Sequence, residues 1–524
     1  MRRAALIAAG LLVGAPLAAQ ATAGGPVRAR SAYEDLQMFS QVLNQIRVNH
    51  PDSLDTHELL VAAIEGMVRA ADPHSFVIPA VRLVPGKEEQ LRAGKLVPVP
   101  VDFTFVGGAP VVASVAAGTA ASRLDILPGD ELVSIDGQHV LAESSEELAI
   151  ALAGAKESEV ALGIERRRQD GSLVRLERRV RRERSGEATA VPVAVLLDST
   201  TGYVRVTTFM NERVAEDLHD ALGRLEKQGM TRLVLDLRDN GGGSVAEAAH
   251  VAGEFLPNGA IVYTAEGRKA ETTDTGRVSR SFWRSERRYP IVVMVNGGTA
   301  SASELVAGAL QDHDRALVVG RPSFGKSLLM RGFPLSDGSI IELVVGRVRT
   351  PCGRVVQREY RTISRHEYYR LASADRDTAG RPSCRTDAGR VVYGGGGVYP
   401  DVPLDPAPDV PAWATRVAEQ SLVLAWVGGY VEAHATALAS LDAFLHVTPS
   451  LPAEAIADFR AFAAKQGVAI PTDTAADARL QRALVRAVAA ARWGEAGWYR
   501  ADAQLDPQIG AAVRAFGQAA ALAR

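Results

Sequence analysis

The sequence predicts a multidomain α/β protein, and three observations support this fold class. At 524 residues the chain is too long for one ordinary domain of roughly 100 to 200 residues. Over residues 202–348, buried-looking strands alternate with helices, which is typical of a layered α/β core. Helical periodicity in residues 33–69 and 411–524 indicates that helices flank this core at both ends.

The first residues have the pattern of a secretory signal. Arg2 and Arg3 precede an apolar run over residues 4–19, and an Ala-x-Ala sequence follows at 19–21. A membrane anchor is the alternative, but the run is shorter than the roughly 20 residues that span a bilayer and contains Pro16. We therefore predict a signal peptide over 1–21. The protein is expected to be exported, periplasmic or extracellular, with no integral membrane segment after cleavage.

Composition gives no reason to expect an anionic partner. The chain is 47% hydrophobic and 23% charged, as is usual for globular proteins, and its formal net charge is −2. A charge near zero provides no electrostatic basis for binding nucleic acid or an anionic membrane surface. The sequence defines neither an oligomeric state nor an activating partner.

The region over residues 22–95 is predicted to be helical. Apolar residues recur at helical spacing in two stretches between Tyr33 and Arg69, with a break near Pro51. The second stretch ends at a turn-like Asp-Pro-His-Ser sequence, residues 72–75. Its histidine, His74, is expected to bond the turn backbone rather than to act in catalysis.

Residues 96–183 have the short β-branched runs of a β-rich domain. Strands are predicted at 110–115, 131–135, 160–165 and 173–180, around a helix at 144–152. The turn Leu-Pro-Gly-Asp at 127–130, followed by an apolar strand and Asp136-Gly137, resembles a PDZ domain. This resemblance implies a groove that binds a peptide C-terminus by strand addition. A structural spacer is the alternative, because residues 97–101 read Val-Pro-Val-Pro-Val and proline has no N–H to offer a carboxylate.

The α/β core is expected over residues 184–410. Its strands are predicted at 203–209, 233–237, 291–295 and 316–319, and its helices at 214–228, 245–255 and 301–311. Asp337-Gly338, between apolar runs, suggests a hairpin. After four glycines at 394–397, residues 411–524 form an alanine-rich helical extension in which no chemistry is visible.

Two segments of this core join a buried strand to a helix. Residues 236–243 read Asp-Leu-Arg-Asp-Asn-Gly-Gly-Gly, so backbone N–H groups can face an anion. An ordinary tight turn is the alternative. Residues 296–304 place serines where a helix dipole and free amides stabilise developing negative charge. Ser301 or Ser303 could instead cap the helix, with Glu304 completing a capping box.

A third segment, residues 320–327, matches the phosphate-loop pattern G-x-x-x-x-G-K-[ST] and contains Lys326. A phosphate loop must open a helix, whereas here Gly332 and Pro334 follow within eight residues of the lysine. Nucleotide binding is therefore the weaker alternative.

The three segments, in this order and behind a PDZ-like region, resemble the C-terminal processing (tail-specific) peptidases. The resemblance covers residues 33–401, including the Asp-Pro-His-Ser turn and the segments at 349–354 and 397–401. It implies a crotonase-like protease core in which Ser301 is the nucleophile and Lys326, 25 residues later, is the general base. It also implies an oxyanion hole made by the amides of Gly242 and Ala302, with Gly243 as a near alternative.

A lysine can activate a serine only when it is uncharged, so burial must lower its pKa. The expected activity is a serine endopeptidase that needs no metal or other cofactor, forms an acyl-enzyme, and cleaves protein or peptide substrates near their C-termini. A catalytically weak, peptide-binding scaffold of the same fold is the alternative.

The chain departs from the family pattern at several positions. Met330 stands where a glutamine often helps to orient the lysine. Asp312 matches an acid of some members, but the eleven helical residues between it and Ser301 span about 16 Å, so we expect a supporting role for Asp312. We expect a supporting role for Glu304 as well. Cys352 and Cys384 flank an insertion at 358–390 and could form a disulfide or stay unpaired.

Overall fold

The computed structural model describes most of the chain and divides it into two units, Met1–Ala71 and Asp72–Arg524. The described residues are 31–78, 96–106, 109–115, 119–121, 124–140, 148, 151–167, 172–183, 189–210, 213–280, 286–336, 339–361, 368, 371, 377–404, 410–445 and 449–522. The predicted signal peptide, the Asp337-Gly338 turn and most of the helix predicted at 144–152 lie outside them. Among the helices within these ranges, none has the length and apolar character needed to cross a membrane.

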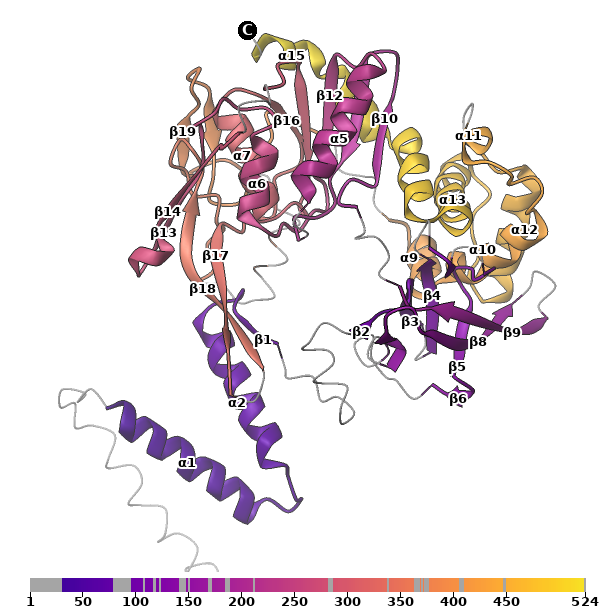
Figure 1. Ribbon diagram of the computed structural model, residues 1–524, viewed down its shortest axis with the longest axis horizontal. Helices are drawn as coiled ribbons and strands as arrows, with labels where there is room; N and C mark the ends of the chain where they lie inside the picture. The colour runs from indigo at the N-terminus through magenta and orange to yellow at the C-terminus, as the bar shows by residue number, and fades with distance from the viewer. Residues whose placement is uncertain are drawn as a thin grey trace, which may run out of the picture. The chain divides into compact units, whose positions relative to one another are not determined.

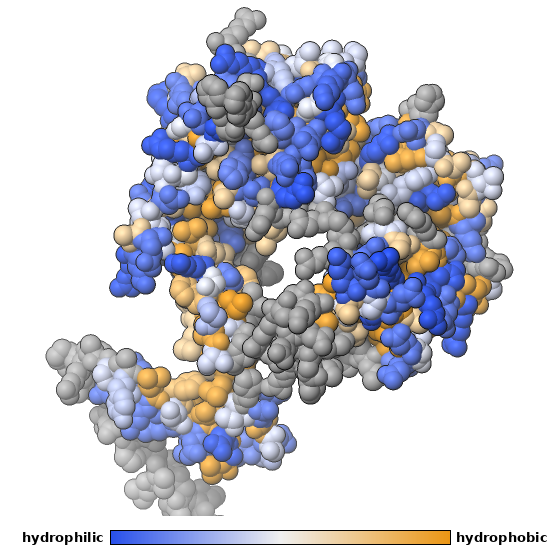
Figure 2. Space-filling view, in the orientation of Figure 1, coloured by the Kyte–Doolittle hydropathy of each residue, from blue (hydrophilic) through white to orange (hydrophobic). Residues whose placement is uncertain are grey.

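The first unit contains two helices, as predicted: α1 (Ala32–Asn49) and α2 (Thr56–Ala71). Helix α1 begins at a capping box, in which the Glu34 N–H donates to Ser31 Oγ at 3.2 Å and the Ser31 N–H donates to Glu34 Oε2 at 2.9 Å. Large apolar side chains, including Leu36 and Met67, are exposed on these helices (Figure 2).

The centre of the second unit is a six-stranded sheet in the order β10-β11-β12-β15-β16-β21. Its strands are β10 (Val193–Leu196), β11 (Thr201–Arg205), β12 (Arg232–Asp236), β15 (Ile291–Val295), β16 (Leu317–Gly320) and β21 (Val402–Pro403). All neighbouring pairs are parallel except β10 with β11. Because side chains alternate between the faces of a strand, the nearly all-apolar strands need cover on both faces.

Helices supply that cover (Figure 1). One face packs against α5 (Val214–Lys227), α6 (Val245–Ala252) and α7 (Ala302–Asp312). The other packs against the last two helices of the chain, α14 (Pro507–Arg514) and α15 (Phe516–Leu522). Val234 and Val292 face this C-terminal layer, whereas their neighbours Leu235 and Val293 face α5 to α7. The three predicted core helices and four predicted strands are thereby confirmed as elements of this fold.

A second sheet in the order β1-β18-β13-β14, with β17 also paired to β18, lies beyond the core. Its strands are β1 (Phe76–Ile78), β13 (Ile261–Gly267), β14 (Asp274–Arg277), β17 (Leu328–Pro334) and β18 (Ile340–Arg349). A small hairpin, β19 (Ser383–Arg385) and β20 (Val391–Tyr393), closes the insertion that follows β18. Strand β17 begins two residues after Lys326, so this sheet fixes the direction in which the chain leaves the lysine.

The PDZ-like region has its own antiparallel sheet, in the order β3-β4-β5-β8-β9 with β6 paired to β5. Its strands are β3 (Val101–Val106), β4 (Ala109–Val115), β5 (Glu131–Ile135), β6 (Gln138–His139), β8 (Glu159–Arg167) and β9 (Leu173–Arg181), and a short pair joins β2 (Leu96–Val97) to β7 (Gly154–Ala155). The four predicted strands are confirmed. Val99 and Val101 are buried in its core, and the buried Arg166 holds Asp130 at 2.7 Å.

The C-terminal region is helical and has a separate apolar core. Its helices are α9 (Ala412–Glu419), α10 (Leu422–Ala433), α11 (Leu441–Phe444), α12 (Ala453–Lys465) and α13 (Thr474–Leu505), ahead of α14 and α15. Leu127, from the Leu-Pro-Gly-Asp turn of the PDZ-like region, packs against this core.

Candidate active site

Ser301 occupies the sharp turn between strand β15 and helix α7. Its φ of 55° and ψ of −117° are unusual for a residue with a side chain, and such backbone strain is concentrated at functional sites. Helix α7 begins at the next residue, Ala302, so the positive end of the helix dipole lies beside the Ser301 hydroxyl. The serine side chain is half-buried. This turn therefore presents a hydroxyl where negative charge is stabilised.

The glycine loop after β12 lies against this turn. Gly242 has a φ of 96°, and a Cβ at this position would lie 2.7 Å from Ala300 O and 2.8 Å from Ala302 N. Only glycine therefore permits the contact. The Gly242 N–H donates to Asn240 Oδ1 at 2.9 Å in this conformation. The N–H groups of Ala302 and Gly243, by contrast, donate to no group among the described residues.

Asn240 holds the glycine loop and the serine turn together. Its carbonyl oxygen accepts the Ala300 N–H at 2.9 Å and the Ser303 hydroxyl at 3.0 Å, and its side chain donates to Val206 O at 2.9 Å. Ser303 is fully buried and committed to this bond. Of the two serines, the structure thus gives Ser303 a structural contact and leaves Ser301 at the surface of the turn.

Lys326 lies in the loop between β16 and β17, and a strand rather than a helix follows it. Without a helix N-terminus to face a phosphate, the phosphate-loop alternative is wrong for this segment. Burial lowers the pKa of Lys326 below its ordinary value, whereas the negative charges of Glu304, Asp72 and Glu342 act in the opposite direction. Within the described residues, no hydrogen bond joins Lys326 Nζ to Ser301 Oγ.

Glu304 joins the two segments that carry Ser301 and Lys326. One carboxylate oxygen, Oε2, accepts the N–H groups of Ser301 and Lys326, each at 2.8 Å. The other, Oε1, accepts the Gly325 N–H at 2.8 Å and the Ser323 hydroxyl at 2.5 Å. Burial raises the pKa of Glu304 to about 7, although these hydrogen bonds act to lower it. The sequence predicted a supporting role for Glu304, and these contacts show how the residue connects the two segments.

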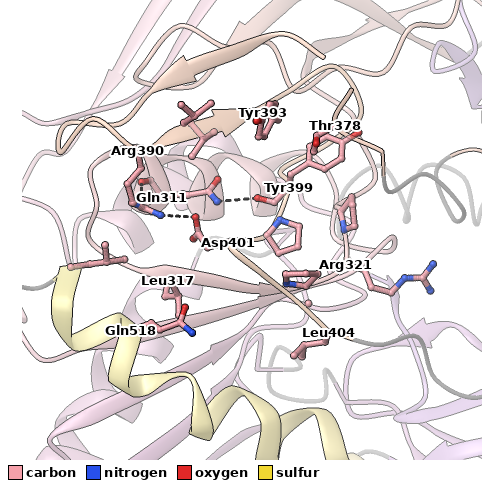
Figure 3. Close-up of a pocket in the computed structure, with 17 residues that line it drawn as sticks. Gln311, Leu317, Arg321, Thr378, Arg390, Tyr393, Tyr399, Asp401, Leu404 and Gln518 are labelled. Atoms are coloured by element: carbon pink, nitrogen blue, oxygen red, sulfur yellow. Dashed lines mark hydrogen bonds and ion pairs between the residues drawn. The ribbon is translucent and has the colours of Figure 1, made fainter. Parts of the chain in front are cut away.

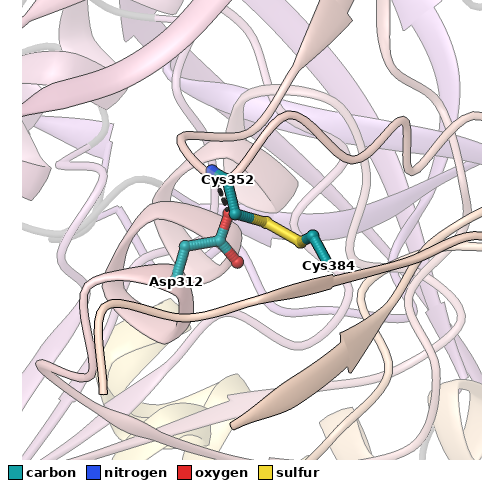
Figure 4. Close-up of side chains that lie close together, drawn as sticks. All are labelled: Asp312, Cys352 and Cys384. Carbon is teal, nitrogen blue, oxygen red and sulfur yellow. Dashed lines mark hydrogen bonds between the residues drawn. A yellow bond between two sulfur atoms is a disulfide. The ribbon is translucent and has the colours of Figure 1, made fainter. Parts of the chain in front are cut away.

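Asp312 lies at the far end of α7 and touches neither Ser301 nor Lys326 in any described hydrogen bond or ion pair. It pairs with the buried Arg354 at 2.8 Å and accepts the Cys352 N–H at 3.1 Å. Cys352 forms a disulfide with Cys384, with their Cα atoms 6.1 Å apart (Figure 4). The disulfide alternative is thereby confirmed. Since both sulfurs are bonded, this cluster of Asp312 and two cysteines offers no thiolate to a metal ion.

His74 is buried in the turn between α2 and β1, and the predicted bond of its side chain to the turn backbone stays a prediction. Asp72 Oδ1 accepts the N–H groups of His74 and Ser75, at 2.8 and 2.7 Å, which closes the turn. The imidazole packs edge-on against the ring of Tyr368, 5.0 Å between centroids.

Two residues beside Lys326 were missed by the sequence analysis. Gln357 Oε1 accepts the Ser327 N–H at 2.8 Å, and the Tyr368 hydroxyl donates to Gly325 O at 3.0 Å. For Gln357, the available signal was a polar side chain directly after the apolar residues Val355 and Val356. Tyr368 lies in the insertion, where no pattern distinguished it. Met330, in β17, is half-buried.

A cavity of about 650 Å³ lies away from this site, between the β16–β21 edge, β20 and α15 (Figure 3). Arg390 pairs with Asp401, another residue of the lining, at 2.5 Å and with Asp314 at 2.6 Å. Gln311 donates to Tyr399 O at 2.9 Å. Neither Ser301 nor Lys326 lines this cavity.

Two family models match the chain: peptidase family S41 over residues 200–364, and the PDZ domain over residues 111–166. The first includes the glycine loop, Ser301 and Lys326. The second includes β5 and the turn before it.

Named relatives agree with these matches. The carboxy-terminal-processing protease of Bartonella bacilliformis is 29% identical over 68% of this chain and 80% of its own length. Carboxyl-terminal-processing peptidase 2, chloroplastic, of Arabidopsis thaliana is 35% identical over 57% of this chain and 59% of its own length. The carboxyl-terminal-processing protease of Synechocystis is 37% identical over 45% of this chain and 53% of its own length. The matched regions thus cover just over half of the last two relatives and four-fifths of the first. With its glycine loop and its serine and lysine segments, the chain is similar to peptidase family S41 over residues 200–364, to a PDZ domain over residues 111–166, and to a carboxy-terminal-processing protease over about two thirds of its length.

Proposed function

We propose that the chain is an exported serine endopeptidase in which Ser301 is the nucleophile and Lys326 is the general base. The observation that carries this proposal is the position of Glu304, whose carboxylate binds the backbone N–H groups of both residues at 2.8 Å. A single buried group thus holds a strained serine turn beside a desolvated lysine. The N–H groups of Ala302 and Gly243, which donate to no described residue, lie in and beside the same turn.

In the first half of the reaction, neutral Lys326 takes the proton from Ser301 Oγ as that oxygen attacks the scissile carbonyl carbon. A C–O bond forms, and the carbonyl oxygen becomes negatively charged. The Ala302 N–H is free to stabilise this oxyanion. The second donor comes from the glycine loop: either the Gly242 N–H, once released by Asn240, or the Gly243 N–H, which donates to none of the described residues.

In the second half, the Lys326 ammonium returns its proton to the leaving nitrogen as the C–N bond breaks, which leaves an acyl group on Ser301. The amine product departs with its new N-terminus. Lys326, neutral again, then takes a proton from the attacking water and gives it to Ser301 Oγ as the acyl–oxygen bond breaks, which releases the acid product and restores the serine hydroxyl and the neutral lysine. Two residues cover both proton transfers, so this scheme requires no cofactor from the chain.

Protein chains cleaved near their C-termini are the proposed substrates, because the PDZ domain is a module that captures peptide C-termini by strand addition. The relatives' names describe carboxy-terminal processing, which agrees with this substrate class. The predicted signal peptide supports a periplasmic or extracellular location.

The test is the dependence of kcat/KM on pH, measured with a fluorogenic peptide that carries a free C-terminal tail. For the wild type we expect the rate to rise with pH, with a midpoint below the ordinary lysine pKa, because only neutral Lys326 accepts a proton. Lys326→Arg keeps the charge but stays protonated, so its rate should fall about 10³-fold. A Lys326→Arg variant with the wild-type rate would contradict the proposal. A wild type that binds tail peptides without cleaving them would favour the scaffold instead.

A further inference from the structure

The two peptide groups that flank Lys326 are held by side chains from a different part of the chain. On one side, the Gly325 carbonyl accepts the Tyr368 hydroxyl at 3.0 Å and the Arg358 N–H at 2.9 Å. On the other, the Ser327 N–H donates to Gln357 Oε1 at 2.8 Å. The backbone on both sides of the lysine is therefore restrained by Gln357, Arg358 and Tyr368.

These restraints are linked to each other. Gln357 Nε2 donates to the Tyr368 hydroxyl at 3.2 Å and to Arg358 O at 2.9 Å. The result is a continuous chain of hydrogen bonds from Ser327, through Gln357 and Tyr368, to Gly325. Because it passes around Lys326 without using the ammonium group, it leaves Nζ available for proton transfer.

Tyr368 also forms an apolar wall beside the lysine loop. Its side chain is fully buried, and its ring packs edge-on against Phe324, with 5.7 Å between centroids. A packed wall next to Lys326 excludes water, and desolvation is the main cause that lowers the pKa of this lysine.

We propose that Gln357 and Tyr368 are the positioning residues of Lys326 in this chain, in place of a side chain at position 330. Met330 has no hydrogen-bonding amide, so β17 itself cannot orient the lysine in that way. Gln357 supplies the amide from the segment after β18, and Tyr368 supplies a hydroxyl from the insertion. The disulfide between Cys352 and Cys384 closes the loop that contains both residues. This inference rests on the proposed role of Lys326 as the base.

The test compares Gln357→Met and Tyr368→Phe with the wild type, using kcat, its pH profile and the melting temperature. Loss of one buried hydrogen bond to the lysine loop should lower kcat at neutral pH about tenfold for Gln357→Met and about threefold for Tyr368→Phe. The rising limb of the profile should move to higher pH in both variants, because a looser loop admits water and raises the pKa of Lys326. At alkaline pH the loss should therefore shrink.

Tyr399→Phe and Gln311→Met are matched controls. Tyr399 donates to Asp377 O at 3.3 Å, and Gln311 donates to Tyr399 O at 2.9 Å; both residues are buried and line the separate cavity. These variants should lower the melting temperature without moving the limb. If the limb in Gln357→Met and Tyr368→Phe stays at its wild-type pH, the positioning role is wrong, even when the melting temperature falls.

Failure of this inference and failure of the proposed function give different results. If Lys326→Arg is inactive while Gln357→Met and Tyr368→Phe keep the wild-type profile, only the positioning role is overturned. If Lys326→Arg retains the wild-type rate, Lys326 is not the base and both conclusions fall.

Discussion

At the scale of single residues, Glu304 connects the proposed catalytic residues, Ser301 and Lys326, through their backbones. It binds four donors with one carboxylate: the N–H groups of Ser301, Gly325 and Lys326, and the Ser323 hydroxyl. Its charge also opposes the effect of burial on the pKa of Lys326. The same side chain therefore affects the geometry of the site and the protonation of the base, and the two effects can be separated by experiment.

Glu304→Gln removes the charge and keeps the size of the side chain. Without that negative charge the pKa of Lys326 should fall further, so the rising limb of the pH profile should move to lower pH. This direction is opposite to that expected for Gln357→Met. The amide NH2 cannot accept the N–H groups that face it, so the free energy of unfolding should fall by about 2 kcal/mol. A limb that moves to higher pH would contradict this account.

The pH dependence of the free energy of unfolding gives a second comparison between the wild type and Glu304→Gln. Burial raises the pKa of Glu304 from 4.5 to about 7. Between these two pH values the folded state therefore holds a proton that the unfolded chain has released. The contribution of Glu304 to the free energy of unfolding is therefore complete below pH 4.5 and is lost as the pH rises through about 7. Urea unfolding should show a larger stability difference between wild type and Glu304→Gln at pH 5 than at pH 8.

At the scale of elements, the last two helices of the chain, α14 and α15, belong to the α/β core. Arg238, which follows β12 and leads into the glycine loop, pairs with Asp506 at the start of α14 at 2.6 Å. It also donates to Gln508 at 2.8 Å and pairs with the fully buried Asp236 at 2.6 Å. Helix α14 therefore helps to fix the segment from which the proposed oxyanion donors come.

Asp506→Asn tests this connection with little change in shape, because asparagine caps a helix as well as aspartate does. Loss of a charged partner of a buried arginine should lower the free energy of unfolding by about 1 to 3 kcal/mol, measured by urea titration. Asp442→Asn is the matched control, since Asp442 pairs with Arg500 at 2.6 Å but is 82% exposed. The control should change stability by less than about 0.5 kcal/mol. Equal effects in the two variants would show that α14 does not restrain β12 through this pair.

At the scale of the whole molecule, periodicity and motifs predicted much of the architecture. The strand expected at 291–295 is β15 residue for residue, and the helix expected at 301–311 is α7 shifted by one position. Such elements follow from local patterns of apolar residues, which a single sequence displays. The sequence also placed Ser301, Lys326 and Glu304 within short, recognisable segments, and the structure joins these segments through Glu304.

Contacts between distant segments could not be predicted in the same way. Alanine-rich periodicity in residues 411–524 indicated helices but not which surface they cover, so the packing of α14 and α15 on the central sheet was missed. Tyr368 is 42 residues from Lys326 and lies in the segment 358–390, where no motif marks it. The bond from the Gly242 N–H to Asn240 Oδ1 was also missed, because it depends on the conformation of the loop rather than on its composition.

The choice of nucleophile is the central claim, and comparing two alanine variants tests it most directly. Ser301→Ala and Ser303→Ala should be assayed side by side on the same tail peptide, with folding of each checked by its melting temperature. Ser303 contributes a buried hydrogen bond to Asn240 O, so its loss should lower the melting temperature and leave measurable turnover. Ser301→Ala should fold normally and cleave at the background rate. Wild-type turnover by Ser301→Ala would show that another group attacks the peptide and would contradict the account.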